Sequence, residues 1–238
     1  NSNLVILGKS GSGKSFATKG ILAHLASDNC KIYVLDPEKE YDNLVKNMHG
    51  KFIDVGSAKQ GRINPFQVFT TLTDDGDEGN SELNTDLSAH LQFLEEFFKI
   101  ILDGITKDAL EILNDCVRQV YENFGITNNT DITSLKPDEF PIFQDVHTFI
   151  TKKFNESKDE FYRSNLRLII TYLNKFVEGG RSSILWNGYS TITTEENFVD
   201  FNFQSLLANK NQDIANAQML LVLRWLDNEI IKNKDYNA

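Results

Sequence analysis

Residues 8–15 read GKSGSGKS, which fits the phosphate-binding loop pattern G-x-x-x-x-G-K-[ST]. Glycines in such a loop allow backbone N–H groups to close around the α- and β-phosphates of a nucleotide. We expect Lys14 to reach the β- and γ-phosphates and the hydroxyl of Ser15 to ligate Mg²⁺. The N-terminus of the following helix adds a favourable field for anions. The loop therefore predicts binding of ATP or ADP together with Mg²⁺.

The sequence around the loop has the context that a phosphate-binding loop requires. Residues 4–7 read LVIL, an apolar run that predicts a buried strand, and residues 16–25 predict a helix. The alternative interpretation is a Gly/Ser-rich turn that binds no ligand. The strand–loop–helix order disfavours that alternative.

Strand and helix signals alternate through the first third of the chain. After the loop and its helix come residues 31–36 (KIYVLD), a short helix through Leu44 and Val45, and residues 51–55 (KFIDV). This βαβαβ pattern predicts a parallel sheet with the phosphate-binding loop at its carboxyl edge. Near-continuous apolar strands are typical of a sheet that is covered on both faces. The predicted fold class is α/β, with a helical subdomain inserted after the third strand.

The middle of the chain has the apolar periodicity of four helices. These span residues 87–102, residues 105–124 with an N-cap at Thr106, residues 143–154 and residues 161–176. Their polar faces carry charges of both signs, which favours ordinary bundle packing over a partner-binding or membrane-surface role. Residues 70–85, rich in acids and glycine, predict an exposed and disordered loop.

The last part of the chain returns to the sheet. Residues 198–203 alternate as a strand, and residues 214–231 predict a long, largely apolar helix buried against that sheet. We therefore expect residues 1–69 to form the N-terminal part of a nucleotide-binding core. Residues 70–178 would then form the helical subdomain with mobile loops, and residues 179–238 the return to the core.

Composition narrows the class of protein. The 238 residues carry a net charge of −10, with 24 Lys and Arg against 34 Asp and Glu, so a broad nucleic-acid-binding surface is disfavoured and any DNA contact would be local. Cys30 and Cys116 suggest reduced thiols in a cytosolic setting. No apolar run is long enough to span a bilayer. The four histidines show no metal-ligand spacing.

Three aspartates, Asp36, Asp54 and Asp200, lie at or within predicted strands. Asp36 is the best candidate for the nucleotide site, because DPEKEY at residues 36–41 places three carboxylates at the carboxyl end of a strand. The alternative is that Asp36 begins a helix whose first turn contains Glu38 and Glu40. For Asp54 and Asp200, a solvated edge or a structural hydrogen bond is favoured over a magnesium role.

These considerations define the expected site. Lys14 is the expected catalytic residue and Ser15 the expected Mg²⁺ ligand. The residues expected to bind the nucleotide are Gly8, Ser10, Gly11, Ser12, Gly13, Lys14, Ser15, Phe16, Asp36, Glu38 and Glu40.

The order of motifs along the whole chain resembles a known family. The motifs are the loop with Phe16, YVLDPEKEY at 33–41, RINPF at 62–66, LWNGYST at 185–191, VDF at 199–201 and AQMLL at 217–221. They are similar to segments of the cytoplasmic ATPases of type IV secretion and conjugative transfer, the TraC/TraE-type branch of the HerA/FtsK superfamily.

The resemblance implies a RecA-like P-loop ATPase domain bearing a helical subdomain. It implies a self-oligomer, a hexamer in the full-length protein, that is cytoplasmic and peripheral at the inner face of the cell membrane, with other type IV secretion components as partners. Such a motor uses ATP to export DNA or protein or to assemble the channel. Lys14 and Ser15 would bind phosphate and Mg²⁺, and Asp36, Glu38 and Glu40 would approach the site.

The resemblance also implies that the chain is incomplete. In the family an acidic (Walker B) strand, a glutamine motif and an arginine finger follow the helix that here ends near Lys232, so the chain is expected to bind nucleotide with little or no turnover. Two alternatives remain open: a nucleotide-binding structural assembly module, and a HerA/FtsK-like DNA translocase, which the acidic composition disfavours. A small-molecule kinase is disfavoured because the six arginines are scattered.

Overall fold

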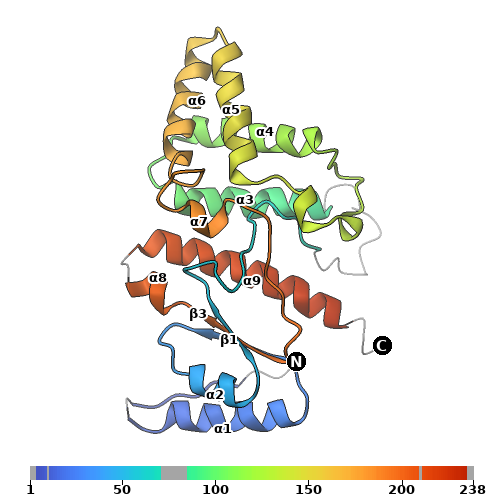
Figure 1. Ribbon diagram of the computed structural model, residues 1–238. Helices are drawn as coiled ribbons and strands as arrows, with labels where there is room; N and C mark the ends of the chain where they lie inside the picture. The colour runs from blue at the N-terminus through green and yellow to red at the C-terminus, as the bar shows by residue number, and fades with distance from the viewer. Residues whose placement is uncertain (1–3, 10, 71–84, 209–210, 235–238) are drawn as a thin grey trace. The chain divides into compact units, whose positions relative to one another are not determined.

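The computed structural model describes residues 4–9, 11–70, 85–208 and 211–234 (Figure 1). The chain divides into two compact units. Residues 1–61 and 192–210 form one, here named the sheet unit, and residues 62–191 and 211–238 form the other, the helical unit. The disordered loop expected at 70–85 lies outside the described residues except for its two ends. The domain boundaries expected from the sequence stay a prediction.

The sheet unit contains a parallel sheet of three strands in the order β1-β3-β2. The strands are β1 (Ile32–Asp36), β2 (Lys51–Asp54) and β3 (Phe198–Asn202). β3 pairs with a neighbour on each side, so all five of its residues are buried. The predicted α/β class with a parallel sheet is confirmed, and these three strands lie where the apolar runs predicted them.

The strand predicted before the phosphate-binding loop is not formed. Residues 4–7 have no strand assignment, and the side chains of Leu4, Val5 and Leu7 are 71%, 74% and 87% exposed. An extended segment becomes a strand only when a neighbour satisfies its backbone hydrogen bonds. No strand among the described residues pairs with this segment. The prediction of a buried strand at residues 4–7 is therefore wrong.

Helices α1 (Lys14–Ser27) and α2 (Asp42–Asn47) pack near the sheet. Ile32, Val45 and Phe198 form a small buried cluster, and Leu22 and Ala26 of α1 pack against it. The predicted loop helix and the short helix through Val45 are thus confirmed. The remaining helix of this unit is α8 (Gln204–Ala208).

Six α-helices and two 3₁₀ turns lie in the described part of the helical unit. They are α3 (Asp86–Ile101), α4 (Lys107–Asn123), η1 (Ile132–Ser134), η2 (Pro137–Glu139), α5 (Phe143–Glu156), α6 (Glu160–Leu173), α7 (Ser183–Trp186) and α9 (Gln212–Lys234). The four helices predicted from periodicity are α3 to α6. The predicted cap is also confirmed, because the Thr106 side chain accepts a hydrogen bond from the backbone N–H of Ala109 at 3.3 Å.

Helix α9 packs against α3 inside the helical unit. Figure 1 shows α9 as the long red helix. The sequence predicted its existence but assigned it to the sheet, because an apolar circumference shows that a helix is buried without showing what covers it. None of the described helices is both long and apolar enough to cross a membrane.

The centre of the helical unit is aromatic. The ring of Phe143 stacks on Phe176 at 5.1 Å between centroids and meets the edge of Phe66 at 4.9 Å. Trp186 lies 5.0 Å from Phe97, and its indole N–H donates to Gln218 at 2.6 Å. Aromatic pairs of this geometry add to area burial. The core therefore joins α3, α5, α7, α9 and the segment around Phe66.

Two motifs that are distant in the sequence lie side by side in this unit. The backbone N–H of Thr191 donates to the carbonyl of Arg62 at 2.9 Å, and the Arg62 N–H donates to the Thr191 hydroxyl at 3.0 Å. The N–H of Asn64 donates to the Ser190 hydroxyl at 2.8 Å. RINPF and the end of LWNGYST thus form one structural element.

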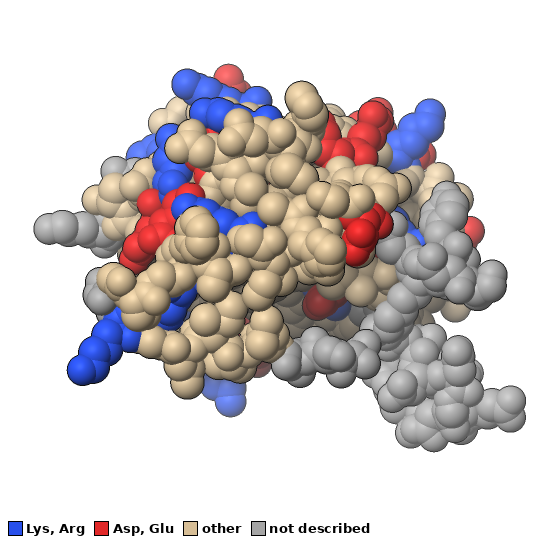
Figure 2. Space-filling view, turned by 90° about the horizontal axis from the view of Figure 1, so that it is seen from below, with Lys and Arg blue, Asp and Glu red and all other residues tan. Residues whose placement is uncertain are grey.

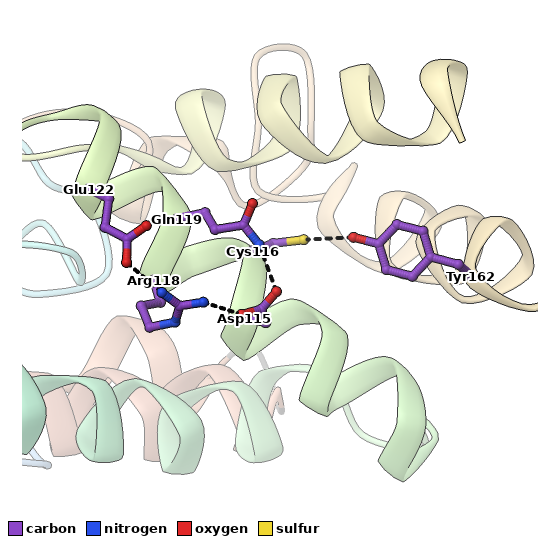
Figure 3. Close-up of polar contacts among 6 residues, drawn as sticks. All are labelled: Asp115, Cys116, Arg118, Gln119, Glu122 and Tyr162. Carbon is purple, nitrogen blue, oxygen red and sulfur yellow. Dashed lines mark hydrogen bonds and ion pairs between the residues drawn. The ribbon is translucent and has the colours of Figure 1, made fainter. Parts of the chain in front are cut away.

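The exposed side of α4 carries a polar network (Figure 3). Arg118 forms ion pairs with Asp115 and Glu122, and Gln119 donates to Asp115 at 2.6 Å. Pairs this exposed add little stability. The Cys116 thiol lies 3.9 Å from the hydroxyl of Tyr162 on α6, and burial raises the pKa of that thiol, which makes it unreactive. Cys30 and Cys116 are both free.

Candidate functional site

The phosphate-binding loop adopts a backbone that only glycine accepts easily. Gly11 and Gly13 have φ values of 77° and 86°, in the left-handed region. A Cβ on Gly8 would lie 2.5 Å from the Ser12 hydroxyl. The positive φ values of Gly11 and Gly13 are therefore what this local structure requires of glycine, and at Gly8 a larger residue would displace the Ser12 side chain. Ser10 lies outside the described residues.

Lys14 folds back over the loop. Its ammonium donates to the carbonyl of Gly8 at 2.7 Å and to that of Lys9 at 2.9 Å. It is also the first residue of α1, so the loop leads directly into the helix N-terminus. An ammonium anchored on two loop carbonyls is held near the phosphate-binding backbone instead of moving freely in solvent. This arrangement fits the role expected for the lysine of a phosphate-binding loop.

The first turn of α1 is open to an anion. Its N-cap, Gly13, has no side chain to accept from the helix N–H groups, and the first turn contains no acid. Ser15 is half-buried, whereas the Phe16 ring is 84% exposed. Uncapped N–H groups at a helix N-terminus favour phosphate, and Ser15 offers a hydroxyl beside them. The residues present therefore fit a nucleotide with Mg²⁺.

Helix α1 exposes large apolar side chains. Figure 2 is a space-filling view from below Figure 1, with Lys and Arg in blue and Asp and Glu in red. On α1 itself Phe16, Ile21 and Leu25 are exposed, and no residue of the helix is fully buried. The helix that follows the loop therefore presents apolar surface.

Asp36 supports the turn that follows β1. It is 1% exposed, and its two carboxylate oxygens accept from the backbone N–H groups of Glu38 at 3.1 Å and Tyr41 at 3.0 Å. Glu38 and Glu40 are exposed on this turn. Helix α2 begins only at Asp42, so the alternative that Glu38 and Glu40 belong to a first helical turn is wrong.

The same turn contacts the loop helix. The ammonium of Lys19 lies 5.5 Å from the centre of the Tyr41 ring, and Tyr41 packs with Leu22 and Ala26 of α1 around the buried cluster. The structure thus brings the acidic turn beside the helix that begins at the phosphate-binding loop. Tyr41 was part of the recognised motif, but the sequence did not indicate that it forms this contact.

Asp54 and Asp200 differ sharply from each other. Asp54 accepts from the Gly56 N–H at 3.0 Å and from the Ser205 hydroxyl at 2.5 Å, which confirms the structural hydrogen bond favoured from the sequence. Asp200 is fully buried at the middle of β3, and no hydrogen-bond partner for its carboxylate lies among the described residues. Neither alternative expected for Asp200 is therefore correct.

Burial, with a smaller contribution from the carboxylate of Asp36, raises the pKa of Asp200 to about 7. The sequence could not show this environment, because it follows from the position of β3 between two strands. Within the described ranges, no group of three or more His, Cys, Asp or Glu side chains could hold a metal ion.

Comparisons with known proteins agree with this geometry. An uncharacterised protein of Bacillus anthracis is 22% identical over 246 residues, covering 96% of this chain and 37% of its own length. The solved structure of VirB4 of Thermoanaerobacter pseudethanolicus superposes with a TM-score of 0.80 at 26% identity, covering 94% of this chain and 55% of that one. The chain thus spans about a third to a half of the length of these relatives.

A family match covers most of the chain. Residues 2–221 match the family described as helicase HerA, central domain, including the loop, the acidic turn, both distant motifs and β3. With the glycine geometry and the anchored Lys14, the match is supported by the site as well as by the sequence. The chain belongs to the HerA central-domain family of P-loop ATPases.

Proposed function

We propose that this chain is the ATP-binding motor domain of a type IV secretion or conjugative transfer system. The observation that carries the proposal is the ammonium of Lys14, anchored over the loop at 2.7 Å and 2.9 Å from the carbonyls of Gly8 and Lys9. The likeness to VirB4 supports the secretion assignment. Export of DNA or protein and assembly of the channel are the tasks that ATP would drive.

Each loop residue has a distinct role in this proposal. Backbone N–H groups of the loop, from Gly8 to Gly13, would hold the phosphates of ATP or ADP, and Lys14 would neutralise their charge. Ser15 would hold Mg²⁺, which withdraws electron density from the phosphate oxygens when bound. Phe16, exposed at the first turn of α1, would lie against the nucleotide.

The three acids at and after the end of β1, Asp36, Glu38 and Glu40, would have different roles. Asp36 uses both of its oxygens to order the turn, so it would act by positioning. Glu38 and Glu40, exposed on the ordered turn, would approach the nucleotide and its Mg²⁺. Turnover by this chain is expected to be slow or absent.

The proposal also covers the oligomer, location and partners of the full-length protein. A self-oligomer, hexameric in the full-length protein, would work at the cytoplasmic side of the cell membrane with other secretion components. The VirB4 match supports this setting.

Lys14→Ala should abolish stabilisation by nucleotide, because it removes the ammonium that is anchored over the loop where the phosphates would bind. ATP with Mg²⁺ at one hundred times its Kd should stabilise the wild type by about 2.7 kcal/mol, visible as a rise in melting temperature. Lys9→Ala is the matched control, since it removes the same charge from the same loop without removing the anchored ammonium. Equal loss in both variants, or no shift of the wild type at millimolar ATP, would contradict the proposal.

Phosphate release separates the motor from a structural module. Slow release that stops in Lys14→Ala favours the motor, whereas nucleotide binding without any release favours a nucleotide-stabilised assembly module. A DNA translocase is favoured by the helicase description of the matched family. Salt-sensitive micromolar binding of single- or double-stranded DNA would support it despite the net charge of −10.

A further inference from the structure

The helical unit has a hollow of about 540 Å³ beside the C-terminal end of α6. Its lining consists of Thr171, Tyr172, Asn174, Lys175 and Arg181. Two of these side chains are cationic, each of the others has a hydrogen-bond donor, and none is a carboxylate. The lining is therefore cationic although the chain as a whole has a net charge of −10.

The two cations are held together by the fold. The segment from Asn174 to Ser182, which joins α6 to α7 in Figure 1, folds back so that the Ser182 N–H donates to the carbonyl of Lys175 at 2.8 Å. A Cβ on Gly180 would lie 2.4 Å from the Asn174 carbonyl oxygen and 2.6 Å from that of Lys175. Only glycine allows this approach, which places Arg181 beside Lys175 despite their equal charge.

Lys175 and Arg181 both have N–H groups that are available to donate to a ligand. The ammonium of Lys175 donates to the carbonyl of Ile101 at 2.8 Å, which leaves two N–H groups. Arg181 has no ion pair or hydrogen bond with any described residue. His147 Nε2 lies 2.9 Å from Asn174 Oδ1, so the amide N–H groups of Asn174 remain available.

The electrostatics of the hollow favour an anion. Burial lowers the pKa of Lys175, the charge of Arg181 lowers it further, and Asp213 partly opposes both. Asp213 and Asp103 line a smaller neighbouring hollow of about 180 Å³ that the two cations also border. In the described part of the chain neither acid forms an ion pair with them. A bound anion would reduce the repulsion between Lys175 and Arg181 that remains in the presence of these acids.

We propose that the hollow between α6 and the 174–182 segment binds a phosphate group, held by Lys175 and Arg181. A planar guanidinium and an ammonium with two free donors suit the oxygens of phosphate. The phosphate could belong to a free phosphate compound or to a phosphodiester. This site is independent of the loop at residues 8–15 and lies in the other unit.

Titration calorimetry with inorganic pyrophosphate tests the proposal, using the full chain with Lys14→Ala so that the loop contributes least. We expect saturable binding at roughly millimolar concentration. Adding Arg181→Gln should weaken this binding by about tenfold or more, because a charge-assisted contact is lost. Arg181→Lys should restore part of it. Arg167→Gln is the matched control, since this arginine of α6 lies over the Phe154 ring and outside the hollow.

Lys175→Met provides a second variant, with near-UV circular dichroism to show that the helical unit is folded. Displacement of pyrophosphate by a short single-stranded oligonucleotide assigns the site to a phosphodiester, and failure to displace it assigns the site to a free phosphate compound; both support the proposal. Equal affinities of the Arg181→Gln and Arg167→Gln chains would overturn it. So would the loss of all pyrophosphate binding in Lys14→Ala alone, a result that leaves the proposed function intact.

Discussion

The helical unit should lose stability as the pH falls below 6.5, because His90 is buried in its neutral form. His90 lies on α3, fully buried, with its ring 5.5 Å from that of Phe93 and 6.2 Å from that of Tyr121. Burial lowers its pKa from 6.5 to about 3, and the charge of Arg224 contributes further. The folded protein therefore protonates His90 much less readily than the unfolded chain does.

The direction and size of this change in stability follow from the linkage between proton binding and folding. Above pH 6.5 the His90 ring is neutral in both states, so it adds no pH dependence. Between pH 6.5 and about 3 mainly the unfolded chain binds the proton, so stability falls as the pH falls. Each pH unit in this window corresponds to about 1.4 kcal/mol. At pH 4.5 the helical unit should therefore be less stable than at pH 7.5 by about 3 kcal/mol from His90 alone.

Urea unfolding followed by tryptophan fluorescence measures this effect in the right unit, since Trp186 and Trp225 both belong to the helical unit. His90→Leu removes the titrating ring and should flatten the pH dependence. His24→Leu is the control, because it changes an exposed histidine of the sheet unit. If wild type and His90→Leu lose equal stability between pH 7.5 and 4.5, the buried histidine is not responsible.

Asp200→Asn should stabilise the sheet unit at pH 8 and leave it nearly unchanged at pH 4. The carboxyl group is buried on the central strand, and its pKa is raised from 3.8 to about 7. Well below pH 3.8 the carboxyl group is protonated in both the folded and the unfolded state. As the pH rises towards 7 the unfolded chain ionises first, so the folded state loses up to about 4 kcal/mol. The uncharged amide of asparagine avoids this cost.

Hydrogen exchange of the β3 backbone amides, compared between variant and wild type at the same pH, reports the stability of this unit. Asp54→Asn is the control of opposite sign, because its carboxylate accepts from Gly56 and Ser205 and its neutralisation should destabilise the unit. Protection at pH 8 that is no greater in Asp200→Asn than in wild type would show that the buried carboxylate costs nothing.

The surroundings of His90 and Asp200 could not be predicted from the sequence. His90 was noted only for its lack of metal spacing, and Asp200 was expected to be solvated or hydrogen-bonded. Both environments depend on segments far away in the chain: α4 and α9 for His90, and the two flanking strands for Asp200. A titratable residue has a perturbed pKa because of what surrounds it, and periodicity alone does not identify those neighbours.

The sequence by itself determined the local features of this protein. The glycines of the loop, the cap at Thr106 and the helices α3 to α6 follow from backbone preferences and from side chains three or four residues apart, which the chain specifies directly. The phosphate-binding loop and its lysine belong to this group. They can be predicted from the sequence because the residues that carry their chemistry lie within eight consecutive positions.

Only the tertiary structure decided which segments meet. It left residues 4–7 without a partner strand in the described part of the chain, placed β3 at the centre of the sheet, packed α9 on α3 and joined Arg62 to Thr191. It also committed both oxygens of Asp36 to the backbone and left the Asp200 carboxylate without a partner among the described residues. Strand order and burial are set by the packing of distant segments, so a pattern of neighbouring residues cannot fix them.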